Sequence, residues 1–133
     1  MIGLLRNTGL AFVALLFLAS GICHFLLTQF FVQIVPPGLP LRREAVYVSG
    51  VFELLGAVGL MARPTRRAAG IGLFVLTILV TPANLYMWRR PELFPDIPES
   101  LLFWRLPAQA ALLATIWFAA IGSRAGATGR SSA

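Results

Sequence analysis

Six polar side chains in otherwise apolar stretches have the chemical types of a binding or proton-transfer site. They are His24, Ser49, Glu53, Asn84, Arg105 and Gln109. Together they supply an acid, a base, an imidazole, two amides and a hydroxyl, which can donate and accept hydrogen bonds in several combinations. Whether they act together depends on which helices or strands carry them. The composition of the chain indicates what kind of elements these are.

The composition is that of a membrane protein. The chain has 133 residues, of which 58% are hydrophobic and 12% are charged, and its mean hydropathy is +0.81. A soluble domain has about a quarter of its residues charged. The polar residues here are too few to cover a soluble globule, and the length indicates a single domain.

Four stretches are long and apolar enough to cross a bilayer, which takes about 20 residues. They cover about 8–30, 43–62, 67–88 and 100–122. In lipid the backbone must satisfy its own hydrogen bonds, so a span is a helix or part of a closed barrel. Barrel strands alternate in polarity, and these runs do not. The sequence therefore predicts an all-α polytopic membrane protein, a four-transmembrane-helix bundle over residues 1–122.

The connections between the spans are punctuated by proline and arginine. Prolines in 35–40 and 90–100 cannot continue a helix and predict rigid turns. The turn at 63–67 is short and basic. No cleavage site follows the first apolar run, so we expect an uncleaved first helix. Residues 123–133 are small and polar and are expected to form a disordered cytoplasmic tail.

All 11 basic residues are arginines, and most lie at the ends of the apolar runs. This placement is typical of interface anchors in a bilayer, whereas a nucleic-acid-binding protein gathers its basic residues on one face. The expected partner is therefore the lipid bilayer and not nucleic acid. Six arginines lie on the side of the termini and four on the other (6, 63, 66, 67, 124 and 130 against 42, 43, 89 and 90). This asymmetry predicts a multi-pass protein of the plasma (inner) membrane with both termini in the cytoplasm.

Cysteine and histidine are too scarce for metal or thiol chemistry. Cys23 is the one cysteine and His24 the one histidine. The chain alone therefore has no disulfide, no C-x-x-C pair and no zinc site, and we expect no metal.

The candidate residues share one depth. A helix rises ~1.5 Å per residue, and Glu53 lies near the middle of its span. His24, Asn84 and Arg105 lie roughly 8–9 Å from the middle, all toward the outer face. Ser49 reaches a similar height, and Gln109 lies just above the middle.

A carboxylate or guanidinium at this depth is costly in lipid, so Glu53 and Arg105 are expected to face the interior. The simplest arrangement is a Glu53–Arg105 pair, formed directly or through His24, Asn84 or water. Gly50, Gly56 and Gly59 allow neighbouring helices to approach closely. Pro82 frees the carbonyl of Ile78 and is expected to kink the third helix. A buried structural pair and amide contacts that hold helices together remain alternatives to a ligand site.

The order of five motifs resembles the DoxX-like family of small four-helix integral membrane proteins. The motifs are Gly21-Ile-Cys-His-Phe25 with Val35-Pro-Pro, Tyr47-Val-Ser-Gly-Val-Phe-Glu53, Pro64-Thr-Arg-Arg67, Thr81-Pro-Ala-Asn-Leu-Tyr-Met87 and Arg105-Leu-Pro-Ala-Gln109. The resemblance covers about residues 8–122. It implies the four-helix fold and a redox-associated role, with a quinone as the cofactor to consider.

Three functions are open at this stage. The first is an accessory subunit or binding module whose polar pocket holds a quinone or another lipid-soluble molecule, with a redox protein or a second copy of the chain as partner. The second is a small proton-coupled exporter, although an Arg105 paired with Glu53 would neutralise its proton-carrying acid. The third is a membrane enzyme acting on a lipidic substrate. No nucleophile or metal set supports catalysis by the chain alone, so an enzymatic role would be that of an oxidoreductase subunit.

Overall fold

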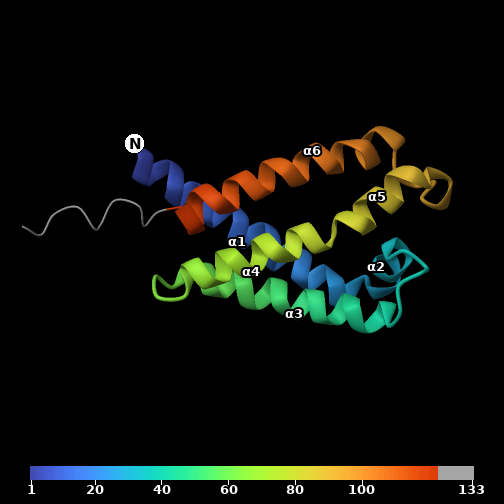
Figure 1. Ribbon diagram of the computed structural model, residues 1–133, viewed down its shortest axis with the longest axis horizontal. Helices are drawn as coiled ribbons and strands as arrows, with labels where there is room; N and C mark the ends of the chain where they lie inside the picture. Colours follow the sequence, from blue (N-terminus) through green and yellow to red (C-terminus); the bar gives the residue numbers. More distant parts are fainter. Residues whose placement is uncertain (123–133) are drawn as a thin grey trace, which may run out of the picture.

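The computed structural model describes residues 1–122, and over these residues the chain is entirely helical between its connections (Figure 1). The elements are α1 (Ile2–Leu26), α2 (Thr28–Ile34), α3 (Arg42–Met61), α4 (Arg66–Leu79), α5 (Thr81–Arg89), η1 (Pro91–Leu93), α6 (Glu99–Ile116) and the π-helical turn η2 (Trp117–Ile121). The all-α prediction is confirmed. The predicted tail, 123–133, lies outside the described residues.

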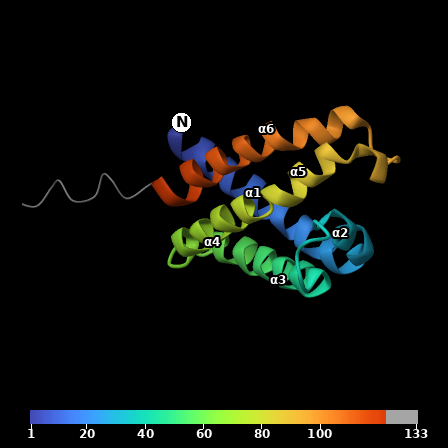
Figure 2. The same cartoon turned by 45° about the vertical axis from the view of Figure 1, so that its right-hand side comes forward.

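Four helical stretches are long and apolar enough to cross a membrane. They are Ile2–Leu26, Arg42–Met61, Arg66–Arg89 and Glu99–Ile121. They run alternately up and down, so the N-terminus, the α3–α4 turn and the end of η2 gather at one end of the bundle, while the α2–α3 and α5–α6 connections gather at the other (Figures 1 and 2). This is the grouping of loops from which the arginine asymmetry was counted.

The first span differs from the expected 8–30. Its helix begins at Ile2 and ends at Leu26, and the backbone of the next residue, Leu27, leaves the helical region (φ −118°, ψ 37°). The Thr28 hydroxyl donates to the carbonyls of His24 (2.9 Å) and Phe25 (3.0 Å), and such side-chain bonds compete with the helical pattern. The chain restarts as the short α2, which the sequence analysis missed, and α2 ends just before Pro36.

The third span is broken between α4 and α5, as Pro82 predicts. The last backbone bond of α4 runs from Val80 N–H to Leu76 O (3.1 Å), and the next runs from Asn84 N–H to Val80 O (3.2 Å). Pro82 has no N–H to donate across the break. Beyond it α5 diverges from α3 and runs alongside α6 (Figures 1 and 2).

Two apolar clusters close the bundle at its two ends. The larger one, near the termini, contains Leu10, Val13, Ala14, Phe17, Ala57, Leu60, Leu73, Ile116, Ala119, Ala120 and Ile121. The smaller one, at the end of the long loops, contains Ile34, Met87, Phe94 and Leu102. Burial of these side chains stabilises both ends of the bundle. Along α1, α4–α5 and α6, the candidate residues lie between the two clusters.

Three arginines expected as interface anchors also cap helix ends. Each side chain donates to backbone carbonyls in the last turn or just beyond it: Arg42 to Val32 and Val35, Arg66 to Leu60, and Arg6 to Ala119. Cations are stabilising at helix C-termini, where carbonyls lack partners. Arg42 thereby fixes α2 against the start of α3.

Glycine brings α1 and α3 together at the level of the candidate residues. A Cβ placed on Gly50 would lie 2.8 Å from the Cβ of His24, closer than real side chains approach. The expected close approach at Gly50 is confirmed. It places His24 of α1 beside Glu53 of α3.

Candidate functional site

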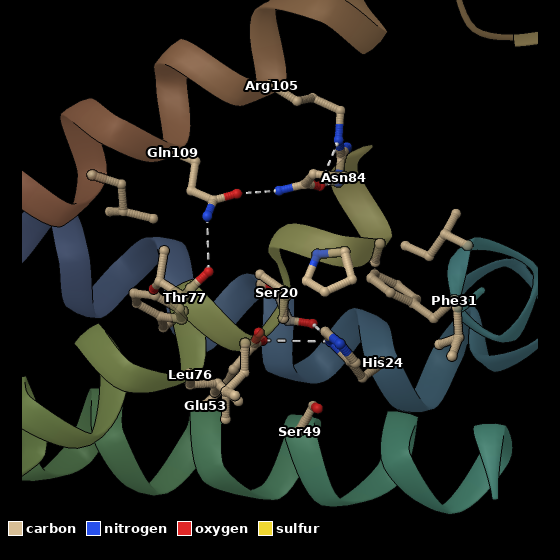
Figure 3. Close-up of a pocket in the computed structure, with 18 of the residues that line it drawn as sticks. Ser20, His24, Phe31, Ser49, Glu53, Leu76, Thr77, Asn84, Arg105 and Gln109 are labelled. Carbon is tan, nitrogen blue, oxygen red and sulfur yellow. Dashed lines mark hydrogen bonds and ion pairs between the residues drawn. The ribbon is translucent and has the colours of Figure 1, made fainter. Parts of the chain in front are cut away.

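All six candidate residues line one cavity of about 670 Å³ between the two apolar clusters (Figure 3). They are His24, Ser49, Glu53, Asn84, Arg105 and Gln109, and the structure adds Ser20 and Thr77, which the sequence analysis missed. Most of the remaining lining is apolar. The polar groups divide into two walls. The carboxylate wall comprises Ser20, His24, Ser49 and Glu53 on α1 and α3. The amide wall comprises Thr77, Asn84, Arg105 and Gln109 on α4, α5 and α6. Thr81, which bonds Gln109, is not among the lining residues.

In the carboxylate wall, the orientation of His24 is fixed on three sides. Its Nδ1 lies 2.8 Å from the backbone oxygen of Ser20. A carbonyl can only accept a hydrogen bond, so Nδ1 carries a hydrogen. The same nitrogen lies 3.4 Å from Oε2 of Glu53. The ring stacks on Phe31, with centroids 4.0 Å apart.

Glu53 is buried, with 5% of its surface exposed. Its Oε2 is the one buried side-chain polar atom within residues 1–122 that has no hydrogen-bond partner. A buried polar group without a partner is costly, and a carboxylate especially so. The Ser20 side chain is another polar group beside this carboxylate (Figure 3). The carboxylate wall therefore has spare capacity to accept a hydrogen bond.

In the amide wall, by contrast, the groups bond one another in series. Arg105 donates through Nε and Nη2 to Oδ1 of Asn84 (3.2 and 3.0 Å). Asn84 Nδ2 donates to Oε1 of Gln109 (2.6 Å). Gln109 Nε2 donates to the Thr77 carbonyl (3.0 Å) and to the Thr81 hydroxyl (2.5 Å). Every amide oxygen and nitrogen of this wall has a partner (Figure 3).

The amide wall also closes the break between α4 and α5. No backbone N–H within the described chain donates to the Thr77 carbonyl across the break, and Gln109 takes that place from the neighbouring helix. The sequence does contain a sign of this contact: Pro82 leaves a carbonyl unpaired in one apolar run, and Gln109 in another run can donate to it. The sequence analysis treated Pro82 and Gln109 separately and so did not connect them.

The direct form of the expected Glu53–Arg105 pair is wrong. Over residues 1–122 the carboxylate lies within salt-bridge distance of His24 only, and Arg105 bonds Asn84 instead. The reason is helix order: α3 packs against α1, α2 and α4, whereas α6 packs against α5, α4 and α1. Depth places two residues at one level but does not make their helices neighbours.

Of the two residues expected to face the interior, Glu53 is buried and Arg105 is exposed. His24, Asn84 and Gln109 are also buried, and Ser49 is half-buried. Although Arg105 is exposed, its guanidinium bonds Asn84 at the cavity. Long basic side chains extend in this way when their stem lies on an apolar surface.

The donors present suit an organic head group better than a metal ion. Within residues 1–122, no three His, Cys, Asp or Glu side chains lie close enough together to hold a metal. The cavity offers a carboxylate, an imidazole, hydroxyls and a guanidinium around an apolar space. Pockets for small organic ligands have this pattern of apolar lining and a few polar groups.

Fold and site together define an all-helical protein with four helices long and apolar enough to cross a membrane, enclosing a cavity with two polar walls. The chain belongs to a domain family of unknown function, DUF8561, which matches residues 13–120. The matched stretch includes all six candidate residues. No curated protein and no solved structure matches the chain.

Proposed function

We propose that the protein is an intramembrane binding module for a lipid-soluble molecule with a polar head group. The observation that carries the proposal is the Glu53 carboxylate. It is buried on the wall of a mostly apolar cavity, and its Oε2 has no hydrogen-bond partner among residues 1–122. A ligand head group would supply the missing partner, and the apolar lining would hold the rest of the ligand.

The size and surroundings of the cavity support an apolar ligand. Its volume, about 670 Å³, lies within the range of about 300–1,000 Å³ found for small-molecule pockets. Phe12 and Leu16 of α1 and Leu79 of α4 line it and are also exposed on the outside of the bundle. A hydrophobic molecule would therefore enter from the side of the bundle, out of the lipid.

The proposal places the protein in the plasma (inner) membrane, with four spans and both termini in the cytoplasm. The apolar stretches and the six-to-four arginine asymmetry support this arrangement. A reporter enzyme that works only in the periplasm, fused after Ala133, should be silent. Activity of that reporter would contradict the orientation.

A quinone is the specific ligand that the resemblance to the DoxX-like family suggests. On this proposal the protein is a redox-associated accessory subunit, working with a redox protein or with a second copy of itself. The support is the order of motifs in the sequence together with a cavity in which their polar residues meet.

The test is to purify the protein in a mild detergent and identify co-purified small molecules by mass spectrometry. The wild type should carry a lipid-soluble molecule, and Glu53→Gln should lose it. Glu44→Gln is the matched control, because Glu44 is exposed at the start of the same helix. Preparations that carry no such molecule, or a Glu53→Gln variant that retains it, would contradict the proposal.

A proton-coupled exporter is the second candidate, and one observation favours it. Arg105 bonds Asn84 and not Glu53, so the carboxylate is not neutralised by a fixed cation and could carry a proton. Reconstituted vesicles with an imposed pH gradient separate the two candidates. Gradient-driven efflux of a hydrophobic cation that Glu53→Gln abolishes would favour the exporter.

A further inference from the structure

The amide wall has little left to offer a ligand. Both amide groups of Asn84 and Gln109 are committed to partners within the wall. Arg105 retains unpaired N–H groups, but it is exposed, so water or polar head groups can reach them. The selection of a head group therefore falls to the carboxylate wall.

The carboxylate wall offers acceptors. Nδ1 of His24 already donates to Ser20, so the hydrogen of a neutral ring is on Nδ1 and Nε2 has a free lone pair. Glu53 adds the oxygen that has no partner over residues 1–122. A carboxylate accepts about four hydrogen bonds, so the neighbouring Ser20 side chain does not exhaust it.

Beside His24, the ionised form of Glu53 fits this wall better than the protonated form. The O–H of the protonated form would need an acceptor, and Nδ1 of His24, 3.4 Å from Oε2, is a donor and cannot supply one. The ionised carboxylate suits a neighbour that donates, and its remaining need is a further donor. Glu53 lines the cavity, so a bound molecule can approach the carboxylate from that side.

From this pattern we infer that the ligand carries a hydroxyl group, which donates a hydrogen bond to the Glu53 carboxylate. The cavity selects a lipid-soluble alcohol or phenol, including the reduced form of a quinone, over the matching ether or ketone. This inference rests on the proposed function, because it names the chemical class that the same cavity takes.

Two probes of nearly equal size test the inference. 4-Dodecylphenol can donate a hydrogen bond, and its methyl ether, 4-dodecylanisole, can only accept one. Binding to the full-length protein in detergent is followed by quenching of tryptophan fluorescence, corrected for partition into empty micelles. A hydrogen bond to a charged group is strong, so the phenol should bind about 10- to 100-fold more tightly than the ether.

Variants at Glu53 show whether the carboxylate causes the preference. Glu53→Met keeps the side-chain length without a polar oxygen, and the two probes should then bind equally. Glu53→Gln keeps an uncharged acceptor, so the preference should fall to severalfold, which leaves a test if Glu53→Met does not fold. Glu44→Gln should retain the full preference, since Glu44 lies outside the cavity.

The outcomes separate this inference from the proposed function. Equal binding of phenol and ether to the wild type, or tighter binding of the ether, overturns the hydroxyl inference while leaving a binding module. A phenol preference that persists in Glu53→Met also overturns it. If neither probe binds and no molecule co-purifies, the proposed function fails and the inference fails with it.

Discussion

The two walls of the cavity contain similar numbers of polar groups but differ in how completely those groups are paired. In the amide wall, Arg105, Asn84 and Gln109 bond one another and the broken end of α4. In the carboxylate wall, Glu53 is buried within 3.4 Å of His24 and still has an oxygen without a partner among the described residues.

This difference distinguishes scaffold from site. A fully bonded buried network fixes helices relative to one another and gains nothing from a ligand. A buried group without a partner is a cost that a ligand can remove. We therefore expect substitutions in the amide wall to affect mainly stability, and substitutions of Glu53 to affect mainly binding.

The largest expected effect is that of Gln109→Leu. This change removes three bonds and leaves Asn84 Nδ2 and the Thr77 carbonyl without partners. At about 0.6–1.5 kcal/mol per bond, the loss of three bonds should lower the free energy of unfolding by about 2–4.5 kcal/mol. Denaturant titration in detergent measures the change. Ala110→Leu, at an exposed neighbouring position of α6, should leave the free energy nearly unchanged, and a similarly small effect of Gln109→Leu would deny the scaffold role.

Gly50→Ala should have the next largest effect, since it acts on the backbone that positions the carboxylate wall. The new Cβ meets the Cβ of His24 at 2.8 Å, so α1 and α3 must separate. Overpacking costs about 1–3 kcal/mol, and alanine returns up to about 1 kcal/mol of helix propensity. A net loss of about 1–2 kcal/mol and weaker ligand retention are expected.

Gly72→Ala provides the matched control for Gly50→Ala. Nothing lies within 4 Å of a Cβ at Gly72. This change should therefore stabilise the protein by about 0.5–1 kcal/mol through helix propensity alone. Equal responses at the two glycines would show that the close approach of α1 and α3 does not matter.

A double-mutant cycle between Glu53→Gln and Arg105→Leu tests the separation of the walls. Because the two side chains have different partners, their effects on the free energy of unfolding should add to within about 0.5 kcal/mol. Breaking a buried ion pair would instead cost about 3–5 kcal/mol for one partner, and the double variant would recover much of it. A coupling above about 1 kcal/mol would restore the pair that the sequence suggested.

The smallest effect is expected at an exposed pair outside both walls. Arg90 donates to Glu92 and so holds the pKa of the Glu92 carboxyl below its ordinary value of 4.5. A lowered folded-state pKa contributes stability above the ordinary value, and this contribution is lost as the pH falls through the lower folded value. Glu92→Gln should be silent at neutral pH, since exposed pairs contribute little, and should flatten the stability curve only below pH 4.5.

The removal of Arg90 checks the cause of that pH dependence. Arg90→Ala should flatten the same acidic limb, because the hydrogen bond from Arg90 is the main cause of the lowered Glu92 pKa. If stability still falls steeply below pH 4.5 in both variants, the acid sensitivity is due to other carboxyl groups.

Hydropathy and proline position were enough to predict most of the fold. The spans follow from the length of the apolar runs, and the break at Val80 follows from Pro82. The short α2 was not predictable in the same way, because it depends on a hydroxyl of Thr28 that bonds carbonyls of its own chain. The residues before and after the α1–α2 break are equally apolar, so hydropathy gives no sign of it.

Depth along the helices was enough to predict which polar residues line the cavity. It was not enough to predict which of them bond one another. Residues at one level meet only if their helices adjoin, and the sequence does not give the order of helices around the bundle. Glu53 and Arg105 were expected to pair because they are opposite charges at a similar depth in lipid, but their helices are not neighbours. Partners supplied by the backbone, such as the carbonyls of Ser20 and Thr77, have no signature in residue type.

The most direct test of the division between scaffold and site is to measure stability and ligand retention together in Glu53→Gln. Compared in the ligand-free state, the free energy of unfolding should change by less than about 1 kcal/mol, since the lost carboxylate oxygen had no hydrogen-bond partner over residues 1–122. The co-purified lipid-soluble molecule should be lost. A variant that loses as much stability as Gln109→Leu while retaining the bound molecule would contradict the account.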